Sequence, residues 1–312
     1  MKVPVLIIGG PTASGKSSLA LDLAQELDGI IINGDSLQIY KGLEILTASP
    51  SHQDRQEVPH RLYGLLDKDH VCTVGMWQDL ALREITSAKG KFPIIVGGTG
   101  LYLDSLIKGL STIPPISKAT RDQARQEYET LGANAFHHRL QEIDPQAASR
   151  IAPGDTQRMT RAWEVYLETQ VPLSQWQQKK KKKKIKDLNP FSILVLPDRE
   201  TLYAHAEERF AHMIDLGVLE EVKATMTIIS PSHPLTKAIG FLPLAEYLKN
   251  HLTLEEAIDQ SKTMTRQYIK RQYTWFRNQV QNAFMVDHIY ARREKTNILS
   301  DLLETLRQKN LW

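Results

Sequence analysis

The sequence predicts an α/β fold in which a mostly parallel β-sheet is flanked by helices. Three continuous apolar runs look like strands that are buried on both sides, and each ends at glycine or at a turn sequence. Stretches of helical periodicity alternate with these runs, and this order is typical of parallel sheets. The expected strands cover residues 3–8, 29–32 and 92–96, and the expected helices cover 17–27 and 76–88.

Residues 115–187 differ in character from the segments on either side. Strand-like runs are absent from this stretch, and charged, helix-favouring segments replace them until an apolar run returns at 192–196. From residue 199 onward the pattern is nearly all helical. We therefore expect an α/β catalytic core made of residues 1–114 and 188–312, with a helical C-terminal part and a helical insertion domain at 115–187.

Composition restricts the function classes only loosely. The 312 residues are 41% hydrophobic and 24% charged, with a formal net charge of +3, as in an ordinary folded protein. An RNA-binding surface would therefore have to come from local clustering of charge. The one cysteine, Cys72, excludes an internal disulfide and suits a reducing compartment. The N-terminal apolar run is too short for a signal sequence or a membrane span, so we expect a cytoplasmic protein without membrane association.

A phosphate-binding motif follows the first expected strand. Residues 10–17 match G-x-x-x-x-G-K-[ST] between a buried strand and a helix, which is the context that this motif requires. The glycines let successive backbone N–H groups converge on one anion, the lysine reaches an outer phosphate, and the serine hydroxyl can hold Mg²⁺. The motif predicts a P-loop NTPase-like fold with a polyphosphate ligand, bound by Gly10, Pro11, Thr12, Ala13, Ser14, Gly15, Lys16 and Ser17.

The acidic residue beside this motif has an unusual position. Enzymes that transfer a γ-phosphoryl group commonly carry an aspartate after a later apolar strand, where it helps to hold Mg²⁺. Here the run 92–96 ends in Gly97-Gly98-Thr99 without an acid, whereas the run 29–32 is followed by Asp35. This arrangement argues against an ordinary ATPase and leaves a carboxylate near the phosphate site without an evident metal-binding duty.

Further segments resemble the tRNA dimethylallyltransferases of the bacterial type, also called tRNA isopentenyltransferases, along nearly the whole chain. Asp35-Ser36-Leu37-Gln38-Ile39-Tyr40 resembles the family's D-S-x-Q-x-Y segment, and Gly97-Gly98-Thr99-Gly100-Leu101-Tyr102 resembles its G-G-T-x-L-Y turn. Asp155-Thr156-Gln157-Arg158-Met159-Thr160-Arg161-Ala162 resembles D-x-Q-R-x-x-R-A. Together with the P-loop, their order along the chain makes the resemblance specific. Other segments in family order are 59–60, 209, 217–222, 237–240 and 266–272.

Three segments depart from the family pattern. Leu46-Thr47-Ala48-Ser49-Pro50 stands where the family usually has G-T-A-K-P, and His60-Arg61 stands where it has paired histidines. Thr169-Gln170-Val171-Pro172 replaces a T-G-x-P turn. All three lie outside the P-loop, Asp35 and Thr99, so they bear on local loop geometry and on an RNA contact, not on the chemistry.

The resemblance implies a specific reaction. A dimethylallyl group would pass from its diphosphate to N6 of the adenosine at tRNA position 37, with Mg²⁺ bound at Ser17. Asp35 would act as the general base, and Thr99, Lys16 and Arg209 would stabilise the departing diphosphate. Simpler roles remain open at this point. Asp35 could cap a helix or bind Mg²⁺, Thr99 could be a turn residue, and Arg209 could form a helix-surface ion pair with its acidic neighbours.

The same resemblance implies contacts with the anticodon stem-loop of tRNA. An adenine stacked in that loop has to be extruded into a pocket, where Ser36 and Gln38 have suitable donors and acceptors to read it. The helical insertion would grip the loop. The residues expected to bind tRNA are Asp35, Ser36, Leu37, Gln38, Thr99, Arg121, Gln157, Arg158, Met159, Thr160 and Arg161.

Two basic segments add to this expectation. Residues 262–277 contain five basic side chains and no acid, interleaved with aromatic residues, as in a phosphate-binding helix or a solvated basic face over a packed one. The lysine run at 179–184 with Lys186 could add non-specific attraction to RNA or simply be solvated.

Three other functions fit part of the pattern. A prenyltransferase that acts on free adenine nucleotides would share the site, but it would not need the insertion or the basic helix. A P-loop kinase of a small metabolite would turn over ATP. A non-catalytic RNA-binding protein could use the P-loop as a structural anion site. Our preferred hypothesis is the tRNA enzyme, a monomer with dimethylallyl diphosphate and tRNA as its partners.

Overall fold

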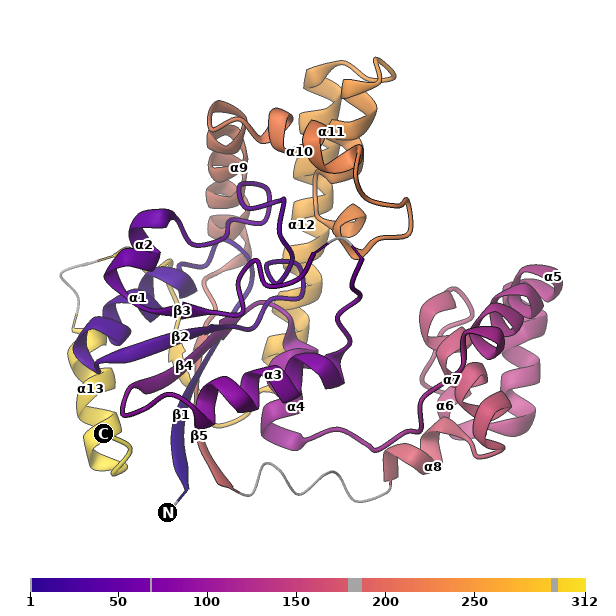
Figure 1. Ribbon diagram of the computed structural model, residues 1–312, viewed down its shortest axis with the longest axis horizontal. Helices are drawn as coiled ribbons and strands as arrows, with labels where there is room; N and C mark the ends of the chain where they lie inside the picture. The colour runs from indigo at the N-terminus through magenta and orange to yellow at the C-terminus, as the bar shows by residue number, and fades with distance from the viewer. Residues whose placement is uncertain (1, 68, 179–186, 293–296) are drawn as a thin grey trace. The chain divides into compact units, whose positions relative to one another are not determined.

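The computed structural model describes residues 2–67, 69–178, 187–292 and 297–312 (Figure 1). The chain divides into two compact units, Met1–Ile107 with Lys186–Trp312, and Lys108–Ile185. We call the first unit the core and the second the insertion. The insertion begins at Lys108, earlier than the expected residue 115, because Ile113 packs with its helices. Each unit has a hydrophobic core of its own.

The core is built on one parallel sheet. In the described part of the chain six strands pair in the order β3-β2-β4-β1-β5-β6, and every pairing is parallel. The predicted α/β fold with a mostly parallel sheet is therefore confirmed. The strands are β1 (Val3–Gly9), β2 (Gly29–Asn33), β3 (His60–Arg61), β4 (Phe92–Gly97), β5 (Leu188–Val195) and β6 (Phe284–Val286).

The two edge strands are missing from the sequence prediction. β3 has two residues and β6 has three, which is too short for a period to be visible. β6 also lies in the part of the chain that we expected to be helical throughout, so that expectation was too broad. Both strands depend on pairing with a longer neighbour, β3 with β2 and β6 with β5.

Helices cover both faces of the sheet. Side chains of β1 alternate between two hydrophobic clusters, with Val5 and Ile7 in one and Leu6 and Ile8 in the other. The helices α1 and α13 supply the second cluster, and most other core helices supply the first. The core helices are α1 (Lys16–Glu26), α2 (His52–Glu57), α3 (Val74–Thr86), α4 (Gly100–Lys108), α9 (Arg199–Asp215), α10 (Val218–Met226), η2 (Pro234–Lys237), α11 (Phe241–Leu248), α12 (Leu254–Gln279) and α13 (Ile298–Gln308).

This topology brings the chemistry-bearing motifs to one edge. Because all the strands are parallel, their carboxyl ends meet at the same edge of the sheet. The P-loop follows β1, Asp35 follows β2 and Thr99 follows β4. In the described residues, no helix is both long and apolar enough to span a membrane.

Helices are the only regular elements among the described residues of the insertion. α5 is interrupted at Gly132, where φ is 73°, so it is one kinked element. Phe136, Met159 and Trp163 lie at the centre of its hydrophobic cluster. The helices are α5 (Lys118–Ile143), α6 (Pro145–Ala148), α7 (Thr156–Thr169) and α8 (Leu173–Gln178).

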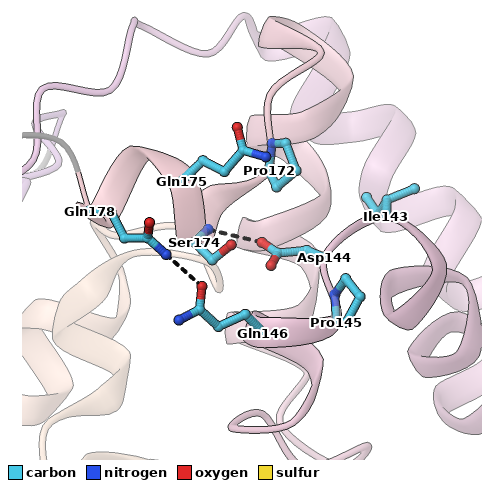
Figure 2. A pocket seen from close by; sticks show the side chains of 8 residues that line it. All are labelled: Ile143, Asp144, Pro145, Gln146, Pro172, Ser174, Gln175 and Gln178. Carbon is cyan, nitrogen blue, oxygen red and sulfur yellow. Dashed lines mark hydrogen bonds between the residues drawn. The ribbon is translucent and has the colours of Figure 1, made fainter.

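One buried carboxylate joins two helices of the insertion. Asp144 is 2% exposed at the base of an open groove of about 700 Å³ (Figure 2). Its Oδ1 accepts from Ala147 N at 3.0 Å, which caps α6, and its Oδ2 accepts from Ser174 N at 2.9 Å in the first turn of α8. Asp144 therefore satisfies helix N-termini at both positions.

Removing this carboxylate should loosen the insertion. We expect Asp144→Ala to destabilise it by about 2 kcal/mol, because one helix cap and one charge-assisted bond are lost. Hydrogen exchange of the amides of α6 and α8 would measure this. Gln178→Ala removes only the bond to Gln146 Oε1 at 2.7 Å on the exposed rim, and serves as the control. Equal exchange in the two variants would contradict the assignment.

Replacing Arg292 should destabilise the core to a comparable extent. It pairs with Glu57, and its guanidinium nitrogens lie 3.6 Å from Asp22 Oδ1 and 3.8 Å from Asp54 Oδ1. These ion pairs join the chain after β6 to α1 and α2. Asp22 is 4% exposed, so Arg292→Met leaves carboxylates in a poorly solvated position and should cost about 2 kcal/mol.

Urea unfolding would test this, with Lys91→Met as the control. Lys91 pairs at 2.5 Å with Asp28, whose side chain is 80% exposed, and exposed pairs contribute at most about 1 kcal/mol. If Arg292→Met lowers the free energy of unfolding no more than Lys91→Met does, the ion pairs of Arg292 do not stabilise the core.

Candidate active site

The P-loop is shaped by contacts with distant parts of the core. Gly15 has a φ of 86°, and a Cβ there would lie 2.1 Å from the carbonyl oxygen of Tyr290. At Gly10 a Cβ would lie 2.4 Å from the carbonyl oxygen of Val195. Tyr290 N also donates to Ser14 O at 3.2 Å. The first and last glycines of the motif are therefore required by close backbone approach as well as by the turn.

Two partly buried cations lie at this loop. Lys16 Nζ donates to Pro11 O at 3.1 Å, and burial, with a further contribution from the Arg209 charge, lowers the Lys16 pKa to about 8. Arg209 on α9 donates from Nη2 to Thr12 Oγ1 at 2.5 Å, and burial lowers its pKa to about 10. Two like charges that are partly withdrawn from water at one loop form a site prepared for an anion.

Unsatisfied polar atoms lie at the same place. Ser14 Oγ and Arg209 Nε are buried and have no hydrogen-bond partner among the described residues. The surface ion pair considered for Arg209 is not formed, since Glu207 accepts instead from Arg266 Nε at 2.7 Å. Buried donors without partners are uncommon in folded proteins and fit a site that is completed by a ligand.

Asp35 is held in a defined orientation beside these cations. Its Oδ1 accepts from Leu37 N at 2.9 Å, and its backbone N donates to Asn33 Oδ1 at 2.7 Å. The Asp35 charge acts on Lys16 and partly opposes the lowering of the Lys16 pKa. Asp35 stabilises a turn and does not cap a helix, and among the described residues its Oδ2 has no recorded partner.

Thr99 connects the turns after β2 and β4. Its Oγ1 accepts from Ser36 N at 3.0 Å and donates to Ser36 Oγ at 3.2 Å. The two turns pack backbone against backbone, because a Cβ on Gly97 would lie 2.1 Å from the carbonyl carbon and oxygen of Gly34. The second glycine-rich motif is thus explained by contact between β2 and β4, and Thr99 is more than a simple turn residue.

Three tyrosines lie near Asp35, and sequence reasoning missed them as site residues. Burial, followed by the negative charge of Asp35, raises the pKa of Tyr63 and Tyr268. Burial also raises the pKa of Tyr102, to which Asp35 makes a smaller contribution. These phenols stay neutral and add no charge that competes with the carboxylate. They come from separate segments of the chain, so no local pattern could have grouped them.

Other residues that support the loop were missed for the same reason. His205 Nδ1 donates to Ala13 O at 2.7 Å, where Ala13 has a φ of 65°. His205 precedes Arg209 by four residues, so both lie on the face of α9 that meets the P-loop. That spacing was the one available signal in the sequence. Asn33, which is fully buried, fixes the turn of Asp35 by donating to Asp35 O at 2.9 Å and Leu62 O at 3.0 Å.

Ser17 opens onto a cavity of about 90 Å³ that Asp54, His60 and Tyr63 also line. The Ser17 side chain is exposed, and its hydroxyl has no hydrogen-bond partner among the described residues. No group of three His, Cys, Asp or Glu side chains in those residues could hold a metal ion by itself. A serine hydroxyl beside a phosphate site suits Mg²⁺, which retains water and takes its other ligands from phosphates.

The residues expected to read the adenine are partly occupied. Gln38 Nε2 donates to Thr47 O at 2.8 Å and to Ala48 O at 3.0 Å, so its amide nitrogen holds the loop where the chain departs from the family pattern. Leu37 N is bound to Asp35. In the same loop Leu46 is buried in the core, and its N donates to Glu221 Oε2 at 2.9 Å.

The other two departures are also accommodated locally. Arg61, in place of a second histidine, is exposed and lies 3.6 Å from Glu84. Gln170, in place of glycine, ends α7 with a φ of 53°, and its Nε2 donates to Leu167 O at 3.1 Å. A side-chain bond thus compensates in part for a backbone conformation that favours glycine.

The expected tRNA-binding residues of the insertion separate into two groups. Gln157, Arg158 and Arg161 begin α7 with solvent-accessible side chains, whereas Met159 is fully buried and Thr160 is 8% exposed in the core of the insertion. Arg121 is exposed on α5. Met159 and Thr160 therefore support the helix, and their side chains do not form its surface.

The basic helix α12 has both a packed and an exposed side. Lys270 and Arg271 are exposed, Phe276 is buried, and Arg266 is bound to Glu207. Aromatic residues of α12 thus pack against the hydrophobic core, while Lys270 and Arg271 remain accessible to a ligand. The lysine run at 179–184 with Lys186 lies outside the described residues.

The chain is similar to known proteins along most of its length. The family model described as IPP transferase matches residues 38–279. A tRNA dimethylallyltransferase of Rhodospirillum centenum is 45% identical over 287 residues, covering 91% of each chain. That of Rickettsia bellii is 39% identical over 310 residues, covering 96% of this chain and 98% of its own.

Solved structures agree with this relationship. The tRNA isopentenylpyrophosphate transferase of Bacillus halodurans superposes with a TM-score of 0.69 at 32% identity, covering 99% of this chain and 98% of its own. A eukaryotic dimethylallyltransferase acting on tRNA reaches a TM-score of 0.83 at 25% identity, covering 99% of this chain and 80% of its own. The extent and identity of these matches show that the chain belongs to the IPP transferase family.

Proposed function

We propose that this chain transfers a dimethylallyl group from dimethylallyl diphosphate to N6 of the adenosine at tRNA position 37, 3′ of the anticodon, and releases pyrophosphate. Its relatives are named for this activity on tRNA. The observation that carries the proposal is that the parallel strands bring the P-loop with Lys16, Asp35 and Thr99 to one edge of the sheet, where Thr99 Oγ1 accepts from Ser36 N at 3.0 Å beside Asp35. A base for an amine and a cradle for a diphosphate are the two groups that this reaction needs together.

The P-loop cations would stabilise the leaving group. When the allylic C–O bond breaks, negative charge grows on the bridging oxygen of the diphosphate. Lys16 and Arg209 are already desolvated and held by Pro11 O and Thr12 Oγ1, so little reorganisation is needed at that moment. The loop amides add further donors to the same anion.

Asp35 would accept the proton from the adenine amine. The lone pair of N6 is delocalised into the ring, so the amine is a poor nucleophile until its proton is removed. As the N6–carbon bond forms, the proton would pass to Asp35 Oδ2, while Oδ1 stays bound to Leu37 N. The electron pair of the C–O bond leaves with pyrophosphate, and the step balances.

Thr99 would act between these two groups. Its hydroxyl is held by Ser36 N at 3.0 Å, on the turn next to Asp35. From that position we assign it a hydrogen bond near the bridging oxygen, where charge develops. Ser36, its partner, belongs to the set that would read the adenine.

Ser17 would bind Mg²⁺ together with the phosphates. The ion would supply further charge neutralisation for the diphosphate when bound. The exposed hydroxyl of Ser17 at the start of α1 fits this role, since it has no competing partner among the described residues. The chain itself supplies the amides and cations around it.

The tRNA would present an extruded base. The Asp35 charge acts on Tyr63, Tyr102 and Tyr268, and we assign these aromatic rings to stacking on the unpaired adenine. Gln157, Arg158, Arg161 and Arg121 of the insertion, with the exposed cations of α12, would bind the anticodon stem-loop. We expect the enzyme to work as a cytoplasmic monomer.

The direct test is incubation with labelled dimethylallyl diphosphate, Mg²⁺ and an anticodon stem-loop carrying adenosine at position 37. Nucleoside analysis should find the label on that adenosine. Transfer to AMP with equal efficiency would favour a nucleotide prenyltransferase, and ATP turnover with a small acceptor would favour a kinase. We disfavour the kinase because β4 ends at Gly97 and is followed by Gly98-Thr99, with no acid in this turn.

Asp35→Asn should retain the diphosphate site and lose the base. We expect kcat to fall by about 10²–10⁴-fold, with a smaller change in affinity for dimethylallyl diphosphate. Single-turnover transfer and calorimetric binding would separate the two effects. Asp28→Asn, at an exposed residue after α1, is the matched control. Unchanged transfer by Asp35→Asn would remove the proposed base.

Diphosphate affinity should also depend on pH through Lys16. Its pKa of about 8 lies below the ordinary value of 10.5, so the free site loses this positive charge as the pH rises through about 8. Affinity should then decline by up to about tenfold per pH unit. Lys16→Arg keeps its charge and should abolish the decline, even if it binds more weakly at neutral pH. An equal decline in both proteins would show that Lys16 is not responsible.

A further inference from the structure

Gln272 on α12 connects the two loops that the reaction would bring together. Its Oε1 accepts from Thr12 N at 2.9 Å, in the P-loop, and its Nε2 donates to Gly98 O at 2.9 Å, in the turn that carries Thr99. The side chain is 6% exposed. Both partners are backbone groups of fixed polarity, so the orientation of the amide is defined by what it binds.

The surrounding packing leaves little freedom for this side chain. A Cβ on Gly98 would lie 2.4 Å from Gln272 Nε2. One turn further along α12, Trp275 and Phe276 approach two more glycines. A Cβ on Gly100 would lie 2.3 Å from the Trp275 ring, and one on Gly9 would lie 2.6 Å from Phe276. The helix thus contacts the ends of both β1 and β4 at glycines, where an added Cβ would have to displace a side chain of α12.

Chemistry restricts the residue at this position. The bridge needs an acceptor for an N–H and a donor for a carbonyl at the end of one side chain, which a primary amide provides. Asparagine is one methylene shorter. Glutamate has no proton to donate to Gly98 O, and its charge would oppose the role of Lys16 and Arg209.

We propose that Gln272 is a positioning residue, which holds the Thr99 turn in register with the P-loop so that the base and the diphosphate are aligned for transfer. It does not touch the reacting atoms. Thr12, which it binds through the backbone, is also the residue whose hydroxyl accepts from Arg209. The turn that carries Thr99 is bonded to the turn that carries Asp35, because Ser36 N donates to Thr99 Oγ1. One amide therefore lies between the leaving-group side and the acceptor side of the site.

This role predicts a particular kinetic result. The P-loop, with Lys16 and Arg209, remains in Gln272→Met, so binding of dimethylallyl diphosphate should change by less than about threefold. Alignment would be lost, and displacements of about 1 Å can cost on the order of 10²-fold in rate, so we expect kcat to fall by about 10–100-fold. If Gln272 had only a packing role, Gln272→Met would lower the unfolding temperature without lowering kcat selectively over binding.

Gly98 offers an independent way to break the same bridge. Gly98→Ala places a Cβ against Gln272 Nε2 and should displace the amide. It should therefore reproduce the kinetics of Gln272→Met. Because both changes remove one interaction, the double variant should be no slower than the slower single variant. Multiplicative losses in the double variant would overturn the proposal.

The inference rests on the proposed prenyl transfer, and the experiment separates their failures. Wild-type enzyme and Gln260→Met, an exposed glutamine on the same helix, are assayed in parallel. Calorimetric binding of dimethylallyl diphosphate and unfolding temperatures are measured for every variant. No transfer by the wild type would refute the proposed function. Two other outcomes, with an active wild type, would refute only the role of Gln272. In one, Gln272→Met has an unchanged kcat; in the other, Gln272→Met loses substrate binding and kcat together.

Discussion

Two desolvated cations, Lys16 and Arg209, are the feature on which the organisation of the site depends. Burial lowers the pKa of both groups, and the Arg209 charge lowers that of Lys16 further. In the absence of a bound anion this arrangement costs stability. The surrounding structure must therefore be rigid enough to maintain it, and the P-loop is bound by residues from α9, from α12 and from the chain after β6.

Close backbone approach provides that rigidity. The glycines of both motifs are explained by what lies against them: Val195 O at Gly10, Tyr290 O at Gly15, Gly34 at Gly97 and Gln272 at Gly98. Flexibility at these positions is secondary, since only Gly15 of the four has a positive φ. The loops at the sheet edge are therefore packed like a core, and donors at this edge are preorganised for a charge that develops only during reaction.

The departures from the family pattern show how loops tolerate change outside this edge. Gln170 takes a glycine-like conformation and compensates with a side-chain bond, and Leu46 replaces glycine by filling a hydrophobic position. Neither alters the contacts of Lys16, Asp35 or Thr99. The constraint on the site comes from its immediate neighbours in space, and more distant turns need only preserve the path of the chain.

The sequence by itself determined the α/β class, the P-loop and the family resemblance. Each of these depends on a pattern of residues that are close together in the sequence. Apolar runs indicate the buried strands, glycines with Lys16 indicate the phosphate loop, and Asp35 follows a strand. Only the tertiary structure decided that the Asp35 charge acts on Lys16 and on three tyrosines, and that Gln272 bridges two loops. It also decided that Met159 and Thr160 face inward, and that β3 and β6 exist. The physical reason is that these features depend on pairing and burial between segments far apart in the chain, for which no local period or spacing carries a signal.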